Sequence, residues 1–131
     1  MVKIIIEESG SHEAREIVSS ALNSGMEVIA PDIALSESLN VLWKHCFIVK
    51  DLKSDELVAA VEDLLALWNG LKECPICSVA REVIQIASSL SITVYDSIYL
   101  AVARFYKSRL FTFDRNLEEA AWKLGISTLP G

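Results

Sequence analysis

Three acidic residues of the chain lie beside segments that could bring their carboxylates together. Glu37 lies within an apolar-patterned helical segment, Asp96 opens another such segment, and Asp114 directly follows a strand-like stretch. Carboxylate oxygens are the ligands that suit hard divalent cations such as Mg²⁺ and Mn²⁺. A cation held by carboxylates can activate water against a phosphodiester. Together the three residues predict a cation site with hydrolytic chemistry.

Each carboxylate also has a purely structural explanation. Asp114 and Asp96 precede or open helices, where an Asp side chain can cap free backbone N–H groups. Glu37 lies opposite the apolar stripe of its helix, on a face shared with Asn40 and Lys44, which is the usual place for a solvated side chain. The functional interpretation therefore depends on the three acids occurring together.

The elements that must position these acids alternate between helices and short strands. Apolar periodicity and stop signals predict helices over residues 11–24, 35–46, 57–68, 78–90, 95–107 and 115–124, and strands over residues 27–30, 109–113 and 126–129. Residues 70–75 read as a break between helices. This alternation predicts an α/β fold with a parallel sheet covered by helices. Ligands collect at the carboxyl ends of such strands, which is where Asp114 is placed.

The bulk composition indicates one domain over residues 1–131. A chain of 131 residues with 52% hydrophobic content can form one continuous core. Its 18 acidic and 12 basic residues give a net charge of −6, which argues against a general RNA or DNA coat protein. The charge argues less against a nuclease, because bound cations would neutralise an acidic pocket.

Targeting signals are absent from the sequence as given. No apolar run approaches the roughly 18 residues of a membrane span, and no basic N-terminal region precedes a cleavage site. We therefore expect a soluble, cytoplasmic protein with no membrane partner.

The cysteines and histidines give little support to other chemistries. Cys74 and Cys77 form a single CxxC without a second pair, so we interpret them as small residues near a helix start rather than as a redox or zinc site. Cys46 is expected in the core. His12 and His45 have no Ser or Cys partner at a meaningful spacing, which disfavours a histidine-based hydrolase.

Three blocks of sequence, in their order and spacing, give the chain a family likeness over nearly its whole length: residues 31–44, 94–101 and 111–117. On these blocks the chain resembles the PIN-domain family, in particular the VapC-type toxins of prokaryotic toxin–antitoxin pairs. The resemblance implies a single PIN-like domain with a central parallel sheet flanked by helices on both faces.

The resemblance also assigns roles to particular residues. It implies that Glu37, Asp96 and Asp114 are the second, third and fourth acids of a metal-binding pocket, that Thr112 supports the pocket, and that Asn40 matches a polar position one turn after Glu37. The implied activity is an endoribonuclease that uses Mg²⁺ or Mn²⁺. The implied partners are an RNA substrate, a cognate antitoxin and a second copy of the chain, with apolar surfaces near residues 39–48 or 57–68.

The family's first acid, an Asp after the first strand, has no direct counterpart. One alignment reads residues 2–8 as the family's first helix and following loop, so that the first strand would precede Met1. The other reads residues 3–6 as the first strand, with Glu7 in place of the Asp and Ser9 in place of a Ser, and deletes the first helix. We favour the first alignment, although the second avoids exposing apolar strand edges.

Two other functions stay open. The chain can be a degenerate, catalytically inactive PIN-like domain that binds protein or RNA after losing its first acid. It can also be an ordinary α/β domain in which all three acids are structural, which their joint spacing disfavours.

Overall fold

The computed structural model describes the backbone of residues 3–6 and 12–129 and the side chains of residues 15–129. The elements in chain order are β1 (Lys3–Ile6), α1 (His12–Asn23), β2 (Glu27–Pro31), α2 (Ile33–Phe47), α3 (Ser54–Trp68), β3 (Lys72–Cys74), a 3₁₀ turn η1 (Ile76–Ser78), α4 (Ala80–Leu90), α5 (Val94–Phe105), β4 (Arg109–Phe111), α6 (Arg115–Lys123) and β5 (Thr128–Leu129). The predicted helices and strands of this part are all present, with ends shifted by a few residues. Gly25 and Gly125 follow α1 and α6 with φ of 81° and 75°, the left-handed conformation that glycine adopts at helix ends.

The strands form one parallel sheet in the order β3-β2-β1-β4-β5. β1 lies at its centre, where Ile4 pairs with Val28 of β2 on one side and with Arg109 of β4 on the other. The favoured helical alignment of residues 2–8 is therefore wrong for residues 3–6. Backbone groups in the middle of a sheet need partners on both sides, and a strand at this place satisfies β2 and β4 together. Glu7 and Ser9 lie outside the described residues.

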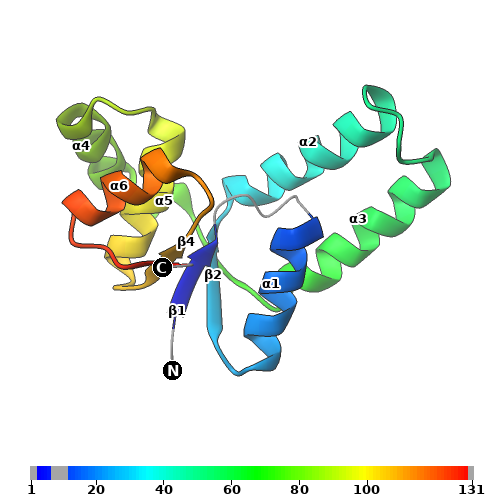
Figure 1. Ribbon diagram of the computed structural model, residues 1–131, viewed down its shortest axis with the longest axis horizontal. Helices are drawn as coiled ribbons and strands as arrows, with labels where there is room; N and C mark the ends of the chain where they lie inside the picture. Colours follow the sequence, from blue (N-terminus) through cyan, green and yellow to red (C-terminus); the bar gives the residue numbers. More distant parts are fainter. Residues whose placement is uncertain (1–2, 7–11, 130–131) are drawn as a thin grey trace.

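Helices cover both faces of the sheet, as predicted (Figure 1). Alternate residues of each strand point to opposite faces. Ile29 and Leu110 join a core formed with α4, α5 and α6, whereas Val28 and Phe111 pack against α1 and the end of α3.

Helix α5 lies at the centre of the larger core. Seven consecutive residues, Ser97–Ala103, are buried, so the helix is enclosed on all sides. The sequence predicts an apolar stripe on one face of this helix, and the packing of α4 over its outer side accounts for the difference.

In the part of the chain that the structure describes, no single helix is long and apolar enough to cross a membrane. Helices α4 and α5 together pass that test by length and composition only, as a pair bent by 119°.

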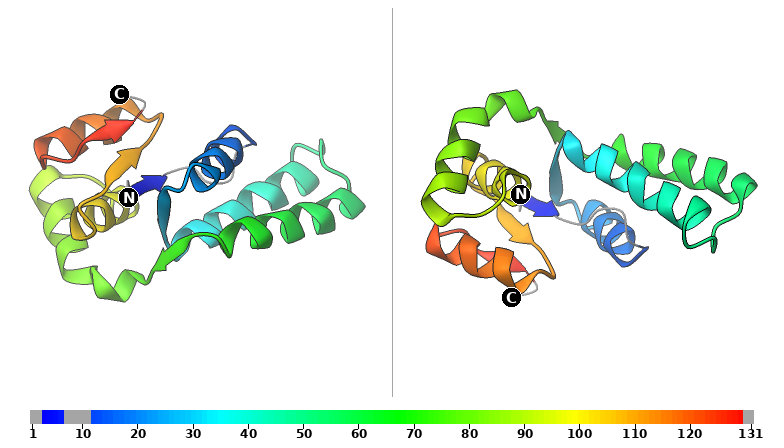
Figure 2. Two further views of the ribbon diagram at one scale, coloured as in Figure 1. Left: turned by 90° about the horizontal axis from the view of Figure 1, so that it is seen from below. Right: turned by 90° about the horizontal axis from the view of Figure 1, so that it is seen from above.

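Helices α2 and α3 form an arm that projects away from the sheet (Figure 2). They pack on each other, and the buried residues of α2 are Ala34, Ser38 and Leu42. The apolar stripe of α2, which the sequence offers as a candidate surface for a second copy, is partly exposed, with Leu39 and Trp43 at 39% and 48%. These side chains are exposed because α2 extends beyond the sheet and has only α3 beside it.

Strand β3 was missed by the sequence pattern. Residues 70–75 read as a break, and yet Lys72–Cys74 pair in parallel with β2. Three residues are too few to show a period, and two of them, Lys72 and Glu73, are exposed at the sheet edge.

The three cysteines differ in burial. Cys74 is fully buried at the end of β3, and Cys77 is exposed in the turn that follows. Cys46, expected in the core, is half-buried on the arm.

Candidate active site

Two of the predicted acids meet at one edge of the sheet. The strand order reverses at β1, whose neighbours β2 and β4 come from opposite halves of the chain, and such a reversal opens a crevice at the carboxyl ends of the strands. Asp114 lies three residues after the end of β4. Helix α5 runs back against the sheet before β4, which brings its first turn and Asp96 to the same edge. The negative charge of Asp114 acts on Asp96 there.

Asp114 caps helix α6. Its Oδ1 accepts hydrogen bonds from the backbone N–H groups of Asn116 at 2.9 Å and Leu117 at 3.3 Å. Its own N–H donates to Oγ1 of the buried Thr112 at 2.9 Å. The capping role expected for an Asp at this place is thus present, and it engages Oδ1. The second oxygen, Oδ2, takes no part in these bonds.

Asp96 is not the cap of its helix. Thr93 is the N-cap of α5, and its Oγ1 accepts a hydrogen bond from the Asp96 N–H at 3.2 Å. Burial and the neighbouring Asp114 raise the pKa of the Asp96 carboxyl, and a hydrogen bond with the Thr93 side chain opposes that rise. A carboxyl whose proton affinity is raised by a neighbouring carboxylate lies in a local excess of negative charge, which a cation would relieve.

Glu37 reaches the site from the arm. It is exposed on α2, as its polar face predicted, and its Oε1 accepts a hydrogen bond from the hydroxyl of Tyr99 on α5. Tyr99 itself is buried. The Tyr99 contact therefore connects an exposed carboxylate of the arm to the central helix that carries Asp96.

Glu37, Asp96 and Asp114 do not form a single cluster. Within the described residues, no group of three or more His, Cys, Asp or Glu side chains is arranged to hold a metal ion. The negative charge of Asp114 acts on Asp96, and Glu37 is connected to the helix of Asp96 through Tyr99. The donors fit Mg²⁺ or Mn²⁺ in kind, since all are carboxylate oxygens and the Asp pair carries uncompensated charge. Glu7, which one alignment puts in the place of the family's first acid, lies outside the described residues.

Sequence reasoning missed two residues of this site. Thr93 had a signal, because a Thr three residues before an acidic residue is a known pattern at helix starts. That pattern would have begun the helix at Val94. Tyr99 had no local signal for its role, because its partner Glu37 is 62 residues away in the chain.

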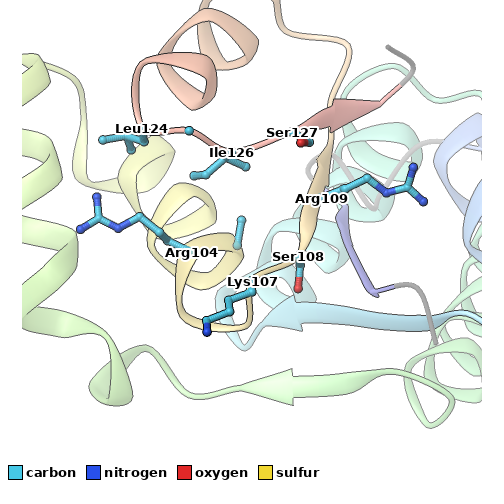
Figure 3. Close-up of a pocket in the computed structure, with 9 residues that line it drawn as sticks. Arg104, Lys107, Ser108, Arg109, Leu124, Ile126 and Ser127 are labelled. Atoms are coloured by element: carbon cyan, nitrogen blue, oxygen red, sulfur yellow. The ribbon is translucent and has the colours of Figure 1, made fainter.

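A second cavity lies at the other end of β4. It encloses about 270 Å³ and is lined by Arg104, Lys107, Ser108 and Arg109, together with residues 124–127, which follow α6. The Arg104 and Arg109 side chains extend in opposite directions from it (Figure 3), and Arg104 pairs with Glu82 at 2.9 Å. Because its cations diverge, this cavity does not form a converging anion site. The carboxyl edge of the sheet therefore remains the candidate active site.

The model of the PIN domain family matches residues 1–123. The chain belongs to the PIN-domain family. Among curated proteins, Ribonuclease VapC3 from Pyrobaculum aerophilum is 32% identical over 116 residues, which cover 88% of this chain and 85% of that protein. The PIN domain described above thus has a relative of similar length that is named as a ribonuclease.

Solved structures share the PIN-domain fold. The crystal structure of PAE2754 from Pyrobaculum aerophilum superposes with a TM-score of 0.74 at 20% identity, over 98% of this chain and 90% of that one. FitAB bound to a DNA fragment gives a TM-score of 0.66 at 20% identity, over 96% and 93% of the two chains. FitAcB from Neisseria gonorrhoeae gives 0.60 at 14% identity, over 95% of each. These structures support the single-layer parallel sheet with helices on both faces.

Proposed function

We propose that this PIN domain is a metal-dependent endoribonuclease of the VapC toxin type. The observation that carries the proposal is the pair formed by Asp96 and Asp114 at the reversal point of the sheet, with the pKa of Asp96 raised by burial and by Asp114. Likeness to a protein named Ribonuclease VapC3 supports RNA as the substrate class.

The residues of the chain have distinct tasks in this proposal. Asp96 and the free oxygen of Asp114 bind the cation, and Glu37 is the third carboxylate. Thr112 holds the backbone at Asp114, so that the capping bonds fix one oxygen and leave the other available. A bound Mg²⁺ or Mn²⁺ would supply Lewis-acid polarisation of the phosphodiester and a water of lowered pKa.

The acidic character of the chain constrains how RNA would bind. A net charge of −6 repels a polyanion, so affinity must come from the cation and from uncharged contacts. Tyr95 and Phe113, each adjacent in sequence to a candidate ligand, are 61% and 48% exposed. Aromatic rings of this kind can stack on unpaired bases, which favours single-stranded RNA.

The test is cleavage of single-stranded RNA in the presence of Mn²⁺ or Mg²⁺. Asp96→Asn should lower the rate by more than about 100-fold, since the loss of a ligand exceeds the 10–100-fold cost of losing an outer partner. Asp63→Asn, the same substitution at an exposed position on the arm, is the matched control and should leave the rate unchanged. Chelation of the cation should stop cleavage by both wild type and control.

The second candidate function is a catalytically inactive PIN-like binding module. It is favoured by the absence, in the described part of the chain, of a preassembled group of three metal-binding side chains. RNA binding without cleavage at any tested Mg²⁺ or Mn²⁺ concentration would support it against the ribonuclease.

We further propose that the arm mediates homodimer formation. Leu39, Trp43 and Phe47 on α2 and Val58 and Leu65 on α3 are all at least 39% exposed. Contiguous apolar surface of this kind is typical of interaction sites. Sedimentation equilibrium should report a dimer for wild type and a shift to monomer for Trp43→Ser.

An antitoxin segment is the proposed second partner. An apolar groove of about 310 Å³ lies between α1 and the end of the sheet, lined by Ile17, Ala21, Met26, Phe111 and Leu129 with two serines, Ser20 and Ser24. Co-expression with the product of a neighbouring small gene should inhibit the nuclease. Ser20→Glu, which places charge at the groove, should weaken that inhibition.

We also infer that the protein acts in the cytoplasm. Cys46, Cys74 and Cys77 are all free thiols, which is the usual state in a reducing compartment. Detection of the tagged full chain in the cytoplasmic fraction of its host would be the direct check.

A further inference from the structure

Tyr99 makes a contact that its place in the core does not require. The residue is 4% exposed and packs among the side chains of the larger core. Its hydroxyl nevertheless leaves that core at the edge and donates to Oε1 of Glu37. Glu37 is exposed on the arm, where a carboxylate has water as an alternative partner.

The position of Tyr99 along α5 puts this contact one helical turn from Asp96. Tyr99 and Asp96 are three residues apart on one helix, so they share a face and lie one turn from each other. Asp96 in turn interacts with Asp114. The hydrogen bond from Tyr99 therefore holds the Glu37 carboxylate at the face of α5 that carries Asp96.

We propose that Tyr99 is a positioning residue for the cation site. Its hydroxyl orients the Glu37 carboxylate through Oε1 and leaves Oε2 available to a divalent cation. This inference rests on the proposed function, because it assumes that Glu37 is a ligand. Partners that orient a ligating carboxylate typically contribute 10–100-fold to metal affinity.

A merely structural role for the hydroxyl makes a different prediction. In that case the bond to Glu37 only satisfies a polar group at the edge of the core, and removing it would change the stability of the fold without a specific effect on metal binding. The two roles separate in a double-mutant cycle, because a residue that acts through Glu37 has no further effect once Glu37 cannot bind the cation.

The experiment is calorimetric titration with Mn²⁺ of wild type, Tyr99→Phe, Glu37→Gln and the double variant. Tyr99→Phe keeps the buried ring and should weaken Mn²⁺ binding by about 10–100-fold. In the Glu37→Gln background the same change should have no additional effect. Tyr106→Phe, the same substitution at the far end of the α5 segment, is the matched control and should bind Mn²⁺ as wild type does.

A second measurement uses the unaltered side chain. The NMR resonance of isotope-labelled Cζ of Tyr99 should shift when wild type is titrated with Mg²⁺. The same resonance should not shift in Glu37→Gln. This measurement keeps the question answerable if Tyr99→Phe does not fold.

Three results would overturn the inference. Equal Mn²⁺ affinity of Tyr99→Phe and wild type would show that the hydroxyl does not position a ligand. A further loss in the Glu37→Gln background would show that Tyr99 acts by another route. Absence of Mn²⁺ binding by wild type would remove the proposed function itself and the inference with it, a pattern distinct from the first two.

Discussion

The half of the molecule that carries Asp96 and Asp114 differs sharply in packing from the arm that carries Glu37. Helix α5 is buried over seven consecutive residues and contacts strands β1, β2 and β4. Helices α2 and α3 pack mainly on each other, and several of their large apolar side chains are exposed. Two acids therefore stand on a rigid base, whereas the third stands on a projecting element.

This difference explains how the site is assembled. Asp114 is fixed by two capping bonds and by Thr112, and Asp96 by the first turn of a buried helix. Glu37 is connected to this base through its contact with Tyr99. In the proposed cation site, two ligands would be preorganised, and the position of the third would change with whatever binds the arm.

The largest expected contrast between the two regions is in stability. Leu100→Ala on α5 removes a fully buried side chain and should lower the free energy of unfolding by about 2–5 kcal/mol. Leu65→Ala on α3, where the side chain is 40% exposed, should cost less than about 1 kcal/mol. Urea unfolding of both variants measures the contrast. Equal losses would show that the arm is as tightly packed as the core.

A smaller effect is expected at the support of Asp114. Thr112→Val removes the oxygen that accepts the Asp114 N–H and leaves that donor without this partner, at a cost of about 1–3 kcal/mol in unfolding free energy. Thr112→Ser keeps the oxygen and should lose clearly less. Equal losses of the two variants in urea denaturation would show that the hydrogen bond contributes no more to stability than the methyl group does.

The smallest effect concerns pH. Because the pKa of Asp96 is raised in the fold, the folded state holds this proton more tightly than the unfolded chain does. The resulting stability is fully present below the unfolded pKa and is lost as pH rises through the raised value. Metal-free Asp96→Asn should therefore melt higher than wild type at neutral pH and at nearly the same temperature below about pH 4. Thermal unfolding of both proteins in chelator at the two pH values measures this difference in melting temperature. A difference that becomes larger in acid would contradict the raised pKa of Asp96.

The sequence predicted the alternation of helices and strands and the position of Asp114 at the carboxyl edge of the sheet. It failed for a very short strand and for contacts between residues that are far apart in the chain. Asp114 could be placed at the carboxyl edge because it follows a predicted strand, whereas only the family resemblance put Asp96 in the same pocket. β3 was missed because three residues carry no period. How far Leu39 and Trp43 are exposed could not be predicted, because periodicity gives a helix its apolar face but not the length over which a neighbour covers it. Tyr99 was missed because its contact with Glu37 exists only in the folded chain.

The central claim is that Asp96 and Asp114 form the base of a cation site. Calorimetric titration of metal-free protein with Mn²⁺, comparing wild type, Asp96→Asn and the arm control Asp63→Asn, tests it most directly. The account predicts saturable binding of equal affinity for wild type and Asp63→Asn, and none for Asp96→Asn. Binding by Asp96→Asn that matches wild type would contradict it.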